Sequence, residues 1–242
     1  MSRIFDVEGP LFSGLSRLAD LFWLNVLFIV CSIPIFTIGA SATALYYVTL
    51  KMVKNEECYI TKSFFRSFKQ NFKQGTAIWL IMMAVGGLLL VDYLIMNGTL
   101  SDVSAIPDTV RKVILVVLLA AAIVYVFTLR YVFPLLARFD NSVKNTIRNA
   151  LLISIRHLPL SAVLVALFIL TIFIFVKFLP QVFIFYLIIV LSLVAYISSH
   201  LFVKIFANYM PTENPEGEEA VENGEIVAAV SDSETEIIEE NN

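Results

Sequence analysis

The sequence predicts an all-α polytopic membrane protein with five to six transmembrane helices and cytoplasmic interfacial amphipathic helices. Of its 242 residues, 59% are hydrophobic and only 15% are charged, with a mean hydropathy of +0.84. Soluble domains are about 45–50% apolar and about 25% charged. The chain also contains several apolar runs close to the roughly 20 residues that a helix needs to cross a bilayer. Together these observations exclude a soluble globular enzyme, a disordered chain and a disulfide scaffold.

Several apolar runs are candidate transmembrane helices. The clear ones cover residues 76–96, 113–136, 158–178 and 182–206. An earlier run, about 18–38, is interrupted by Pro34. It is either one span followed by a cytoplasmic helix, or two short spans, with an extra one at 34–50. We therefore expect five or six spans, within a helical membrane domain of residues 1–210.

Basic residues predict the orientation, because loops rich in Lys and Arg stay on the cytoplasmic side. Six basic residues lie between positions 51 and 73, and five lie between positions 130 and 156. Arg130 and Arg138 are interpreted as members of this cytoplasmic set rather than as buried charges. Both basic segments and the C-terminus are then cytoplasmic. The N-terminus is outside with five spans and inside with six.

The formal net charge of −3 is the sum of two unlike segments. Residues 211–242 contain 11 acidic residues and no Lys or Arg, whereas the rest of the chain contains all 17 basic and nine acidic residues, a net charge of +8. A segment with many like charges and no aromatic residue cannot form a core. We expect a disordered acidic cytoplasmic tail that is solubilising or docks onto a basic surface, including the chain's own loops.

Residues 62–74 have the pattern of an amphipathic helix at the membrane surface. Four basic residues fall on one helical face: Lys62, Arg66, Lys69 and Lys73. Phenylalanines form a separate face, so the helix would meet the acyl boundary with Phe and anionic headgroups with Lys and Arg. It is interpreted as an anchor for the next span or as a docking surface. Residues 139–154 have a similar pattern, with an apolar row at Val143, Ile147 and Leu151.

Catalytic and metal-binding patterns are nearly absent. The two histidines lie about one span apart, and the chain has no HExxH, CxxC or glycine-rich phosphate loop. Zinc needs three or four clustered ligands, and the sequence places none together. Asp20 follows Arg17 by three residues, which predicts an ion pair on one helix face. We expect no enzyme activity, no cofactor, no metal and no nucleic-acid partner.

Residues 34–45 combine proline and glycine with Thr and Ser inside an apolar region. A broken helix is tolerated at membrane depth only where protein or a water-filled cavity covers the freed backbone groups. Small residues four apart also let helices approach closely. The segment is interpreted as a kinked helix contact or as the lining of a polar cavity. The candidate structural or cavity residues are Asn25, Pro34, Thr37, Gly39, Thr43 and Asn71.

Part of this region resembles a known family. The motif is CSIPIFTIGA at 31–40 followed by TALYY at 43–47, with a phenylalanine-rich run at 63–72 and YVFPLL at 131–136. It resembles the YesL family, the bacterial domain of unknown function 624. The resemblance supplies no catalytic residues.

The resemblance implies a multi-pass protein of the bacterial plasma membrane. Members of this family tend to be encoded beside carbohydrate uptake transporters and sugar-responsive regulators. The resemblance therefore implies a non-enzymatic accessory or regulatory component associated with carbohydrate uptake or polysaccharide use. The expected partners are a bilayer with anionic headgroups and a carbohydrate transporter or membrane sensor. The alternative is a small transporter or channel subunit with a polar cavity near residues 34–45.

Overall fold

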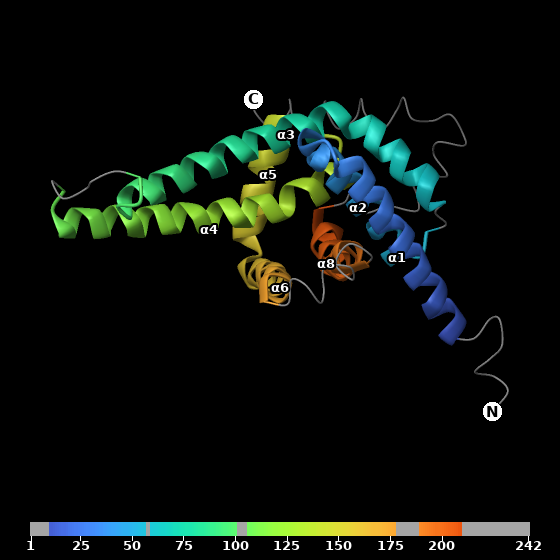
Figure 1. Ribbon diagram of the computed structural model, residues 1–242. Coiled ribbons are helices and arrows are strands. Elements are labelled where there is room, and N and C mark those ends of the chain that lie inside the picture. The colour runs from blue at the N-terminus through green and yellow to red at the C-terminus, as the bar shows by residue number, and fades with distance from the viewer. Residues whose placement is uncertain (1–9, 57–58, 101–105, 178–188, 210–242) are drawn as a thin grey trace, which may run out of the picture. The chain divides into compact units, whose positions relative to one another are not determined.

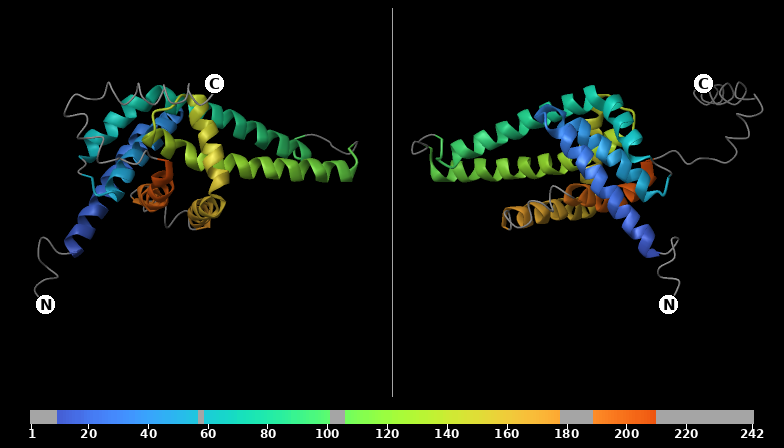
Figure 2. Two further views of the ribbon diagram at one scale, coloured as in Figure 1. Left: turned by 180° about the vertical axis from the view of Figure 1, so that it is seen from behind. Right: turned by 45° about the vertical axis from the view of Figure 1, so that its right-hand side comes forward.

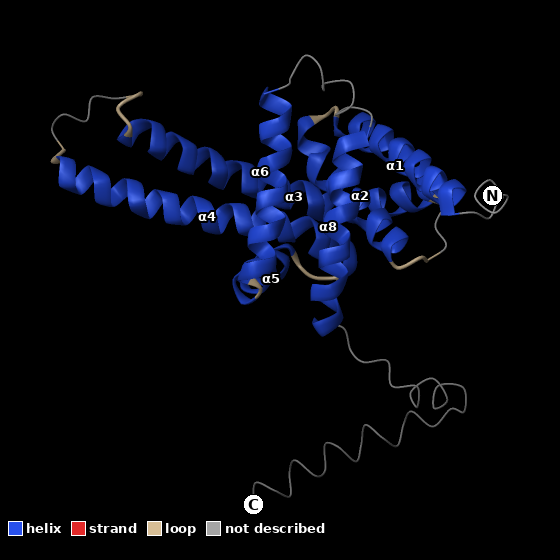
Figure 3. Cartoon of the chain, turned by 90° about the horizontal axis from the view of Figure 1, so that it is seen from below, coloured by secondary structure: helices blue, strands red, loops and turns tan. Residues whose placement is uncertain are grey.

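The computed structural model describes residues 10–56, 59–100, 106–177 and 189–209. Over these ranges every regular element is a helix and none is a strand (Figure 3), which confirms the all-helical prediction. The tail predicted at 211–242 and the first residues of the span predicted at 182–206 lie outside them. The chain divides into two units, Met1–Ile205 and Phe206–Asn242. In the second, the described residues end in the 3-10 turn η4, Ala207–Tyr209.

The first unit is a succession of helices (Figure 1). They are α1 (Pro10–Ser32), the 3-10 turn η2 (Ile35–Thr37), α2 (Ile38–Val53), α3 (Ile60–Met96), α4 (Asp108–Arg138), α5 (Val143–Arg156), α6 (Leu158–Lys177) and α8 (Leu191–Phe206). Four of the described helices are long and apolar enough to cross a membrane: α1 from Gly14, α3, α4 and α6. The chain is therefore a helical membrane protein, whereas the predicted total of five or six spans is not confirmed.

Pro34 separates the first two helices. Proline has no N–H to donate and disfavours the helical conformation of the residue before it. α1 accordingly ends at Ser32, and α2 runs back beside it (Figure 1). Arg17 near the start of α1 donates a hydrogen bond of 2.7 Å to Asn55 just beyond α2. The helix at the predicted first span thus ends at Ser32, before the reversal, and it remains long and apolar enough to be a span. One span followed by a helix and two short spans both stay predictions.

Arg17 does not form the ion pair expected with Asp20. Its guanidinium donates instead to Asn55 and to the Tyr196 hydroxyl, at 2.7 and 3.1 Å. The return of α2 and the approach of α8 supply these partners, and neither is visible in the local spacing of the sequence. The arginine thus joins three helical segments.

α3 is one continuous helix through both the basic segment at 62–74 and the span at 76–96 (Figure 2). Its 37 residues contain no proline, and Gly75 at the junction keeps helical geometry. At 1.5 Å per residue the helix is about 55 Å long, far beyond the roughly 30 Å of bilayer hydrocarbon. The separate surface helix predicted here is not confirmed, because nothing in the sequence breaks the helix.

α5 corresponds to the second predicted amphipathic segment, 139–154, but begins four residues later, at Val143. Ser142 caps it by accepting a hydrogen bond of 3.4 Å from the backbone N–H of Asn145. The buried residues are Thr146, Ala150, Ile153 and Ser154. The predicted apolar row of Val143, Ile147 and Leu151 is only partly buried. α5 packs against α4, and the placement of this row at the membrane surface stays a prediction.

The core of the unit surrounds α2. Ten of its 16 residues are buried, and it contacts α1, α3 and α4. The Phe202 ring of α8 packs edge-on against Tyr46 of α2 and Tyr131 of α4, with centroid distances of 5.7 and 5.2 Å. The Tyr131 and Ser161 hydroxyls share a hydrogen bond of 2.8 Å. These contacts bring α4, α6 and α8 together around the second helix.

Candidate functional site

Two glycines form the crossing point of α2 and α3. A Cβ atom on Gly39 would lie 2.7 Å from the Cβ of Trp79, and one on Gly75 would lie 2.9 Å from the Cα of Ala40. Ordinary van der Waals contact begins at about 3.4 Å. Only glycine therefore fits at these two positions without moving a helix. The crossing is a close helix contact of the kind that the small residues of 34–45 indicate.

The break at Pro34 leaves backbone carbonyls without helical partners, and side chains supply them. The Thr37 hydroxyl lies 2.6 Å from the carbonyl of Cys31 and 2.7 Å from that of Pro34. The indole N–H of Trp79 donates to the carbonyl of Ile35 at 2.8 Å. Because buried backbone groups need partners, these bonds stabilise the reversal and hold α3 against it.

Asn25 joins α1 to the start of α8. It is fully buried, and its Oδ1 accepts a hydrogen bond of 3.0 Å from the backbone N–H of Ser192. The Ser192 hydroxyl in turn donates to the carbonyl of Leu21 at 2.7 Å. The first N–H groups of a helix have no partner within it, so Asn25 supplies one from a helix 167 positions away in sequence.

Thr43 and Asn71 form hydrogen bonds inside their own helices. The Thr43 hydroxyl donates to the carbonyl of Gly39 at 2.8 Å, and the Asn71 amide donates to the carbonyl of Ser67 at 3.1 Å. None of the six candidate residues from the sequence lines the cavity described next. The structure places Asn25, Thr37, Gly39 and Thr43 in the buried packing of the helices, whereas Pro34 is exposed.

A cavity of about 250 Å³ lies between six helices. Its lining residues come from six helices: α1, α2, α3, α4, α6 and α8. Ile38, Ala42 and Leu45 line it from α2, which places the cavity beside the segment at 34–45. Its other walls include Trp79, Phe133 and Phe168, so the lining is predominantly apolar, and Arg130 is the charged residue among the described residues that line it.

The Arg130 guanidinium has few partners. One Nη donates to the Ser198 hydroxyl at 3.2 Å, and the guanidinium carbon lies 5.1 Å from the centroid of the Phe168 ring. Its Nε is buried and has no hydrogen-bond partner. Among the described residues, both ion pairs involve Glu56, and neither includes Arg130. The cavity therefore holds a positive charge without a described counter-ion.

This arrangement leaves the charge poorly compensated. Insertion of an arginine costs about 2.5–3.5 kcal/mol at the centre of a membrane helix, and this is an upper bound for Arg130, which lies eight residues before the end of α4. A charged hydrogen bond contributes about 1.5–3 kcal/mol, and a cation–π contact about 0.5–2 kcal/mol. The Ser198 and Phe168 contacts thus roughly offset insertion, while the buried Nε costs about 1–3 kcal/mol more. An anion at the Nη donors that Ser198 does not use would add compensation for the charge without reaching the buried Nε.

Pro134 lies one helical turn after Arg130 in α4. It lies inside the helix, four residues after Arg130, and has no N–H to donate to the Arg130 carbonyl. An arginine inside an apolar run, followed by proline after one turn, is the signal that could have identified this site. The density of basic residues at 130–156 places Arg130 with the cytoplasmic arginines, and its place in a cavity was not predicted.

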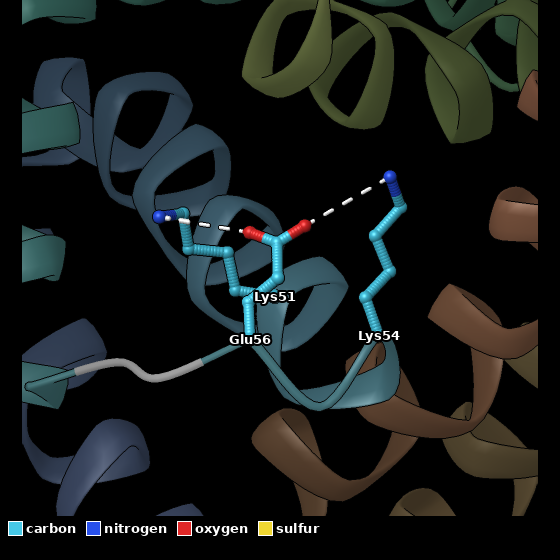
Figure 4. Close-up of polar contacts among 3 residues, drawn as sticks. All are labelled: Lys51, Lys54 and Glu56. Carbon is cyan, nitrogen blue, oxygen red and sulfur yellow. Dashed lines mark ion pairs between the residues drawn. The ribbon is translucent and has the colours of Figure 1, made fainter. Parts of the chain in front are cut away.

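A second charged feature lies on α3. At the end of α2, Lys51 and Lys54 each form an ion pair with Glu56, at 3.7 and 3.9 Å (Figure 4), and pairs in contact with solvent contribute at most about 1 kcal/mol. The four basic residues of α3 are all exposed and have no ion pair with any described residue. We call them the α3 basic face: Lys62, Arg66, Lys69 and Lys73. This face remains free to meet anionic partners.

Comparison with known families finds a match in the N-terminal half of the chain. A family model described as "Protein of unknown function, DUF624" matches residues 21–93. The match covers less than half of the chain. The resemblance to the YesL family is thereby confirmed over the α1–α2 reversal, the glycine crossing and most of α3. No curated protein and no solved structure matches the chain.

The matched family is described as one of unknown function, so the match assigns no activity. The matched segment ends at residue 93, before α4 begins. Arg130 and Ser198 therefore lie outside the matched segment, while the α2 and α3 walls of the cavity lie inside it. Within the described part of the chain, no group of three His, Cys, Asp or Glu side chains could hold a metal ion. The Arg130 cavity and the α3 basic face are the features from which function can be argued.

Proposed function

We propose that this DUF624 protein is a non-enzymatic accessory or regulatory component of the bacterial plasma membrane, associated with carbohydrate uptake or polysaccharide use. The association with carbohydrate rests on the family resemblance. The observation that supports a docking role is the α3 basic face, whose four side chains are exposed and free of described ion pairs.

In this proposal the α3 basic face is cytoplasmic, as is the C-terminus. It meets the anionic headgroups of the inner leaflet and the acidic surface of a carbohydrate transporter or membrane sensor. Each basic residue near an anionic leaflet contributes about 1 kcal/mol. Reversal of several of these charges should therefore release a partner that the face holds by electrostatic attraction.

The test is photo-crosslinking in living cells, with a photoreactive amino acid at Gln70, an exposed residue of α3. We expect crosslinks to a carbohydrate-transporter subunit or membrane sensor. The triple variant Lys62→Glu, Arg66→Glu, Lys69→Glu should lose them. The matched control is Lys112→Glu, which changes a basic residue near the start of α4 and should keep them. Crosslinks to neither kind of protein, or crosslinks that survive the triple variant, would contradict the proposal.

A second candidate function, a small transporter or channel subunit, is supported by the cavity beside residues 34–45. Ala42 lines this cavity, whereas Ala44 is fully buried and does not. A transport path predicts that a membrane-impermeant maleimide labels Ala42→Cys from one side of the membrane and blocks flux. Ala44→Cys should remain unlabelled. Failure to label Ala42→Cys from either side would contradict this function.

A further inference from the structure

The Arg130 cavity combines one charged group with apolar walls. Trp79, Phe133 and Phe168 supply aromatic surface, and Leu45 and Val194 supply aliphatic surface. Two of the polar side chains in its lining already donate hydrogen bonds to backbone carbonyls. The Trp79 indole donates to the Ile35 carbonyl, and the Thr171 hydroxyl donates to the Leu167 carbonyl. A ligand rich in hydroxyl groups would therefore leave most of its polar atoms without partners.

The position of Arg130 differs from that of the three arginines that follow it in the chain. Arg138, Arg148 and Arg156 are exposed, whereas Arg130 is half-buried with its Nε inaccessible to solvent. A guanidinium has five N–H donors in a planar fork that matches a carboxylate. Ser198 and the Phe168 ring occupy one donor and one face of it, so donors remain for an anion.

We infer that the Arg130 cavity binds a single-chain fatty carboxylate. Its carboxylate pairs with the Arg130 guanidinium, and the first part of its acyl chain lies against the apolar walls. The cavity volume of about 250 Å³ is just below the range of pockets for drug-sized ligands, about 300–1,000 Å³. This volume favours one chain with one small anionic group over a diacyl phospholipid with its glycerol and esters. The inference goes beyond the proposed docking function and does not rest on it.

The test measures binding of radiolabelled palmitate to the full-length protein in nanodiscs of neutral phosphatidylcholine. We expect saturable binding that Arg130→Met weakens about 10- to 100-fold, the loss expected for one charge-assisted hydrogen bond. Arg130→Lys, which keeps the charge, should bind more tightly than Arg130→Met. The matched control, Arg148→Met, removes an exposed arginine and should bind like the unchanged protein. Equal binding by Arg130→Met and the unchanged protein would overturn the inference.

A second variant tests the cavity without touching the charge. Ala42→Phe should fill the space beside Arg130 and reduce palmitate binding, whereas Ala120→Phe, at an exposed position of α4, should not. Thermal unfolding of each variant verifies its folding. Palmitate carrying a diazirine should label residues 38–46 or 191–195, which include lining residues. Labelling confined to other segments would refute the site even if a variant fails to fold.

Competitors identify the occupant. Hexadecanol, which has the chain without the charge, should compete weakly with palmitate, because it cannot pair with the guanidinium. Equal competition by hexadecanol would overturn the role of Arg130. Phosphatidylglycerol should also compete weakly. If it displaces palmitate at equal concentration, the occupant is an anionic phospholipid, and the assignment to a fatty carboxylate is wrong.

Discussion

The glycine crossing of α2 and α3 allows a quantitative prediction. In Gly39→Ala the new Cβ would lie 2.7 Å from the Cβ of Trp79 and closer still to the carbonyl oxygen of Gly75. The first distance is about 0.7 Å short of ordinary contact, and neither obstacle is the end of a flexible side chain. The helices must separate, and overpacking of this kind costs about 1–3 kcal/mol. α2 is the helix around which the unit packs, so the cost should appear in global stability.

The matched control is Gly87→Ala on the same α3 helix. A Cβ at Gly87 would meet nothing within 4 Å, so this variant should show only the helix-propensity gain of up to about 1 kcal/mol. Gly39 is the second residue of α2, where this gain is at most as large, so Gly39→Ala should be less stable than Gly87→Ala chiefly by the overpacking cost of about 1–3 kcal/mol.

The assay is unfolding of the full-length protein in detergent micelles, followed by far-UV circular dichroism during titration with sodium dodecyl sulfate. We expect Gly39→Ala to unfold at a lower denaturant concentration than the unchanged protein, and Gly87→Ala at an equal or higher one. The double variant with Gly75→Ala should cost less than the sum of the single changes, because both act on one contact. Equal stability of Gly39→Ala and Gly87→Ala would refute the reasoning.

Three further predictions concern contacts between distant helices and the ends of the chain. Asn25→Leu leaves the N–H of Ser192 without its partner and should lower unfolding free energy by about 1–3 kcal/mol, whereas Asn71→Leu, whose amide bonds only within α3, should cost less. Asn55 has a φ of 56°, so Asn55→Val should be about 1–2 kcal/mol less stable than Asn55→Gly, and equal stability of the two variants would contradict this strain. Reporter fusions at the N- and C-termini should both read as cytoplasmic, because Arg17 lies beside Asn55 at the start of the basic segment. An N-terminal reporter on the outer side would show that the α1–α2 reversal does not return the chain to its starting side.

Local chemistry explains why several elements could be predicted. α6 occupies Leu158–Lys177, nearly the predicted span at 158–178, because a continuous apolar run has few alternatives to a helix in a bilayer. Pro34 gave the position of the reversal for a similar reason, since its ring and missing N–H act on the adjacent residues. The small residues of 34–45 indicated a close contact without naming its partner, which proved to be Gly75.

Other features depend on which helices meet. The buried side of α5 is set by its packing on α4, so the row with the most apolar side chains is not the row that is buried. The need for glycine at position 75 of α3 follows from the approach of α2, whose backbone occupies the space that a side chain would need. Residue spacing within either helix does not contain this information.

The sequence by itself determined the class of the protein, because a chain with 59% hydrophobic and 15% charged residues can cover so much apolar surface only with lipid. It also determined the break at Pro34 and a resemblance to the DUF624 family that the family model confirms over residues 21–93. The tertiary structure decided what Arg130 does. Ser198 and Phe168 lie 68 and 38 positions from it in sequence, and only the packing of six helices turns an arginine near a helix end into the charged group of an apolar cavity.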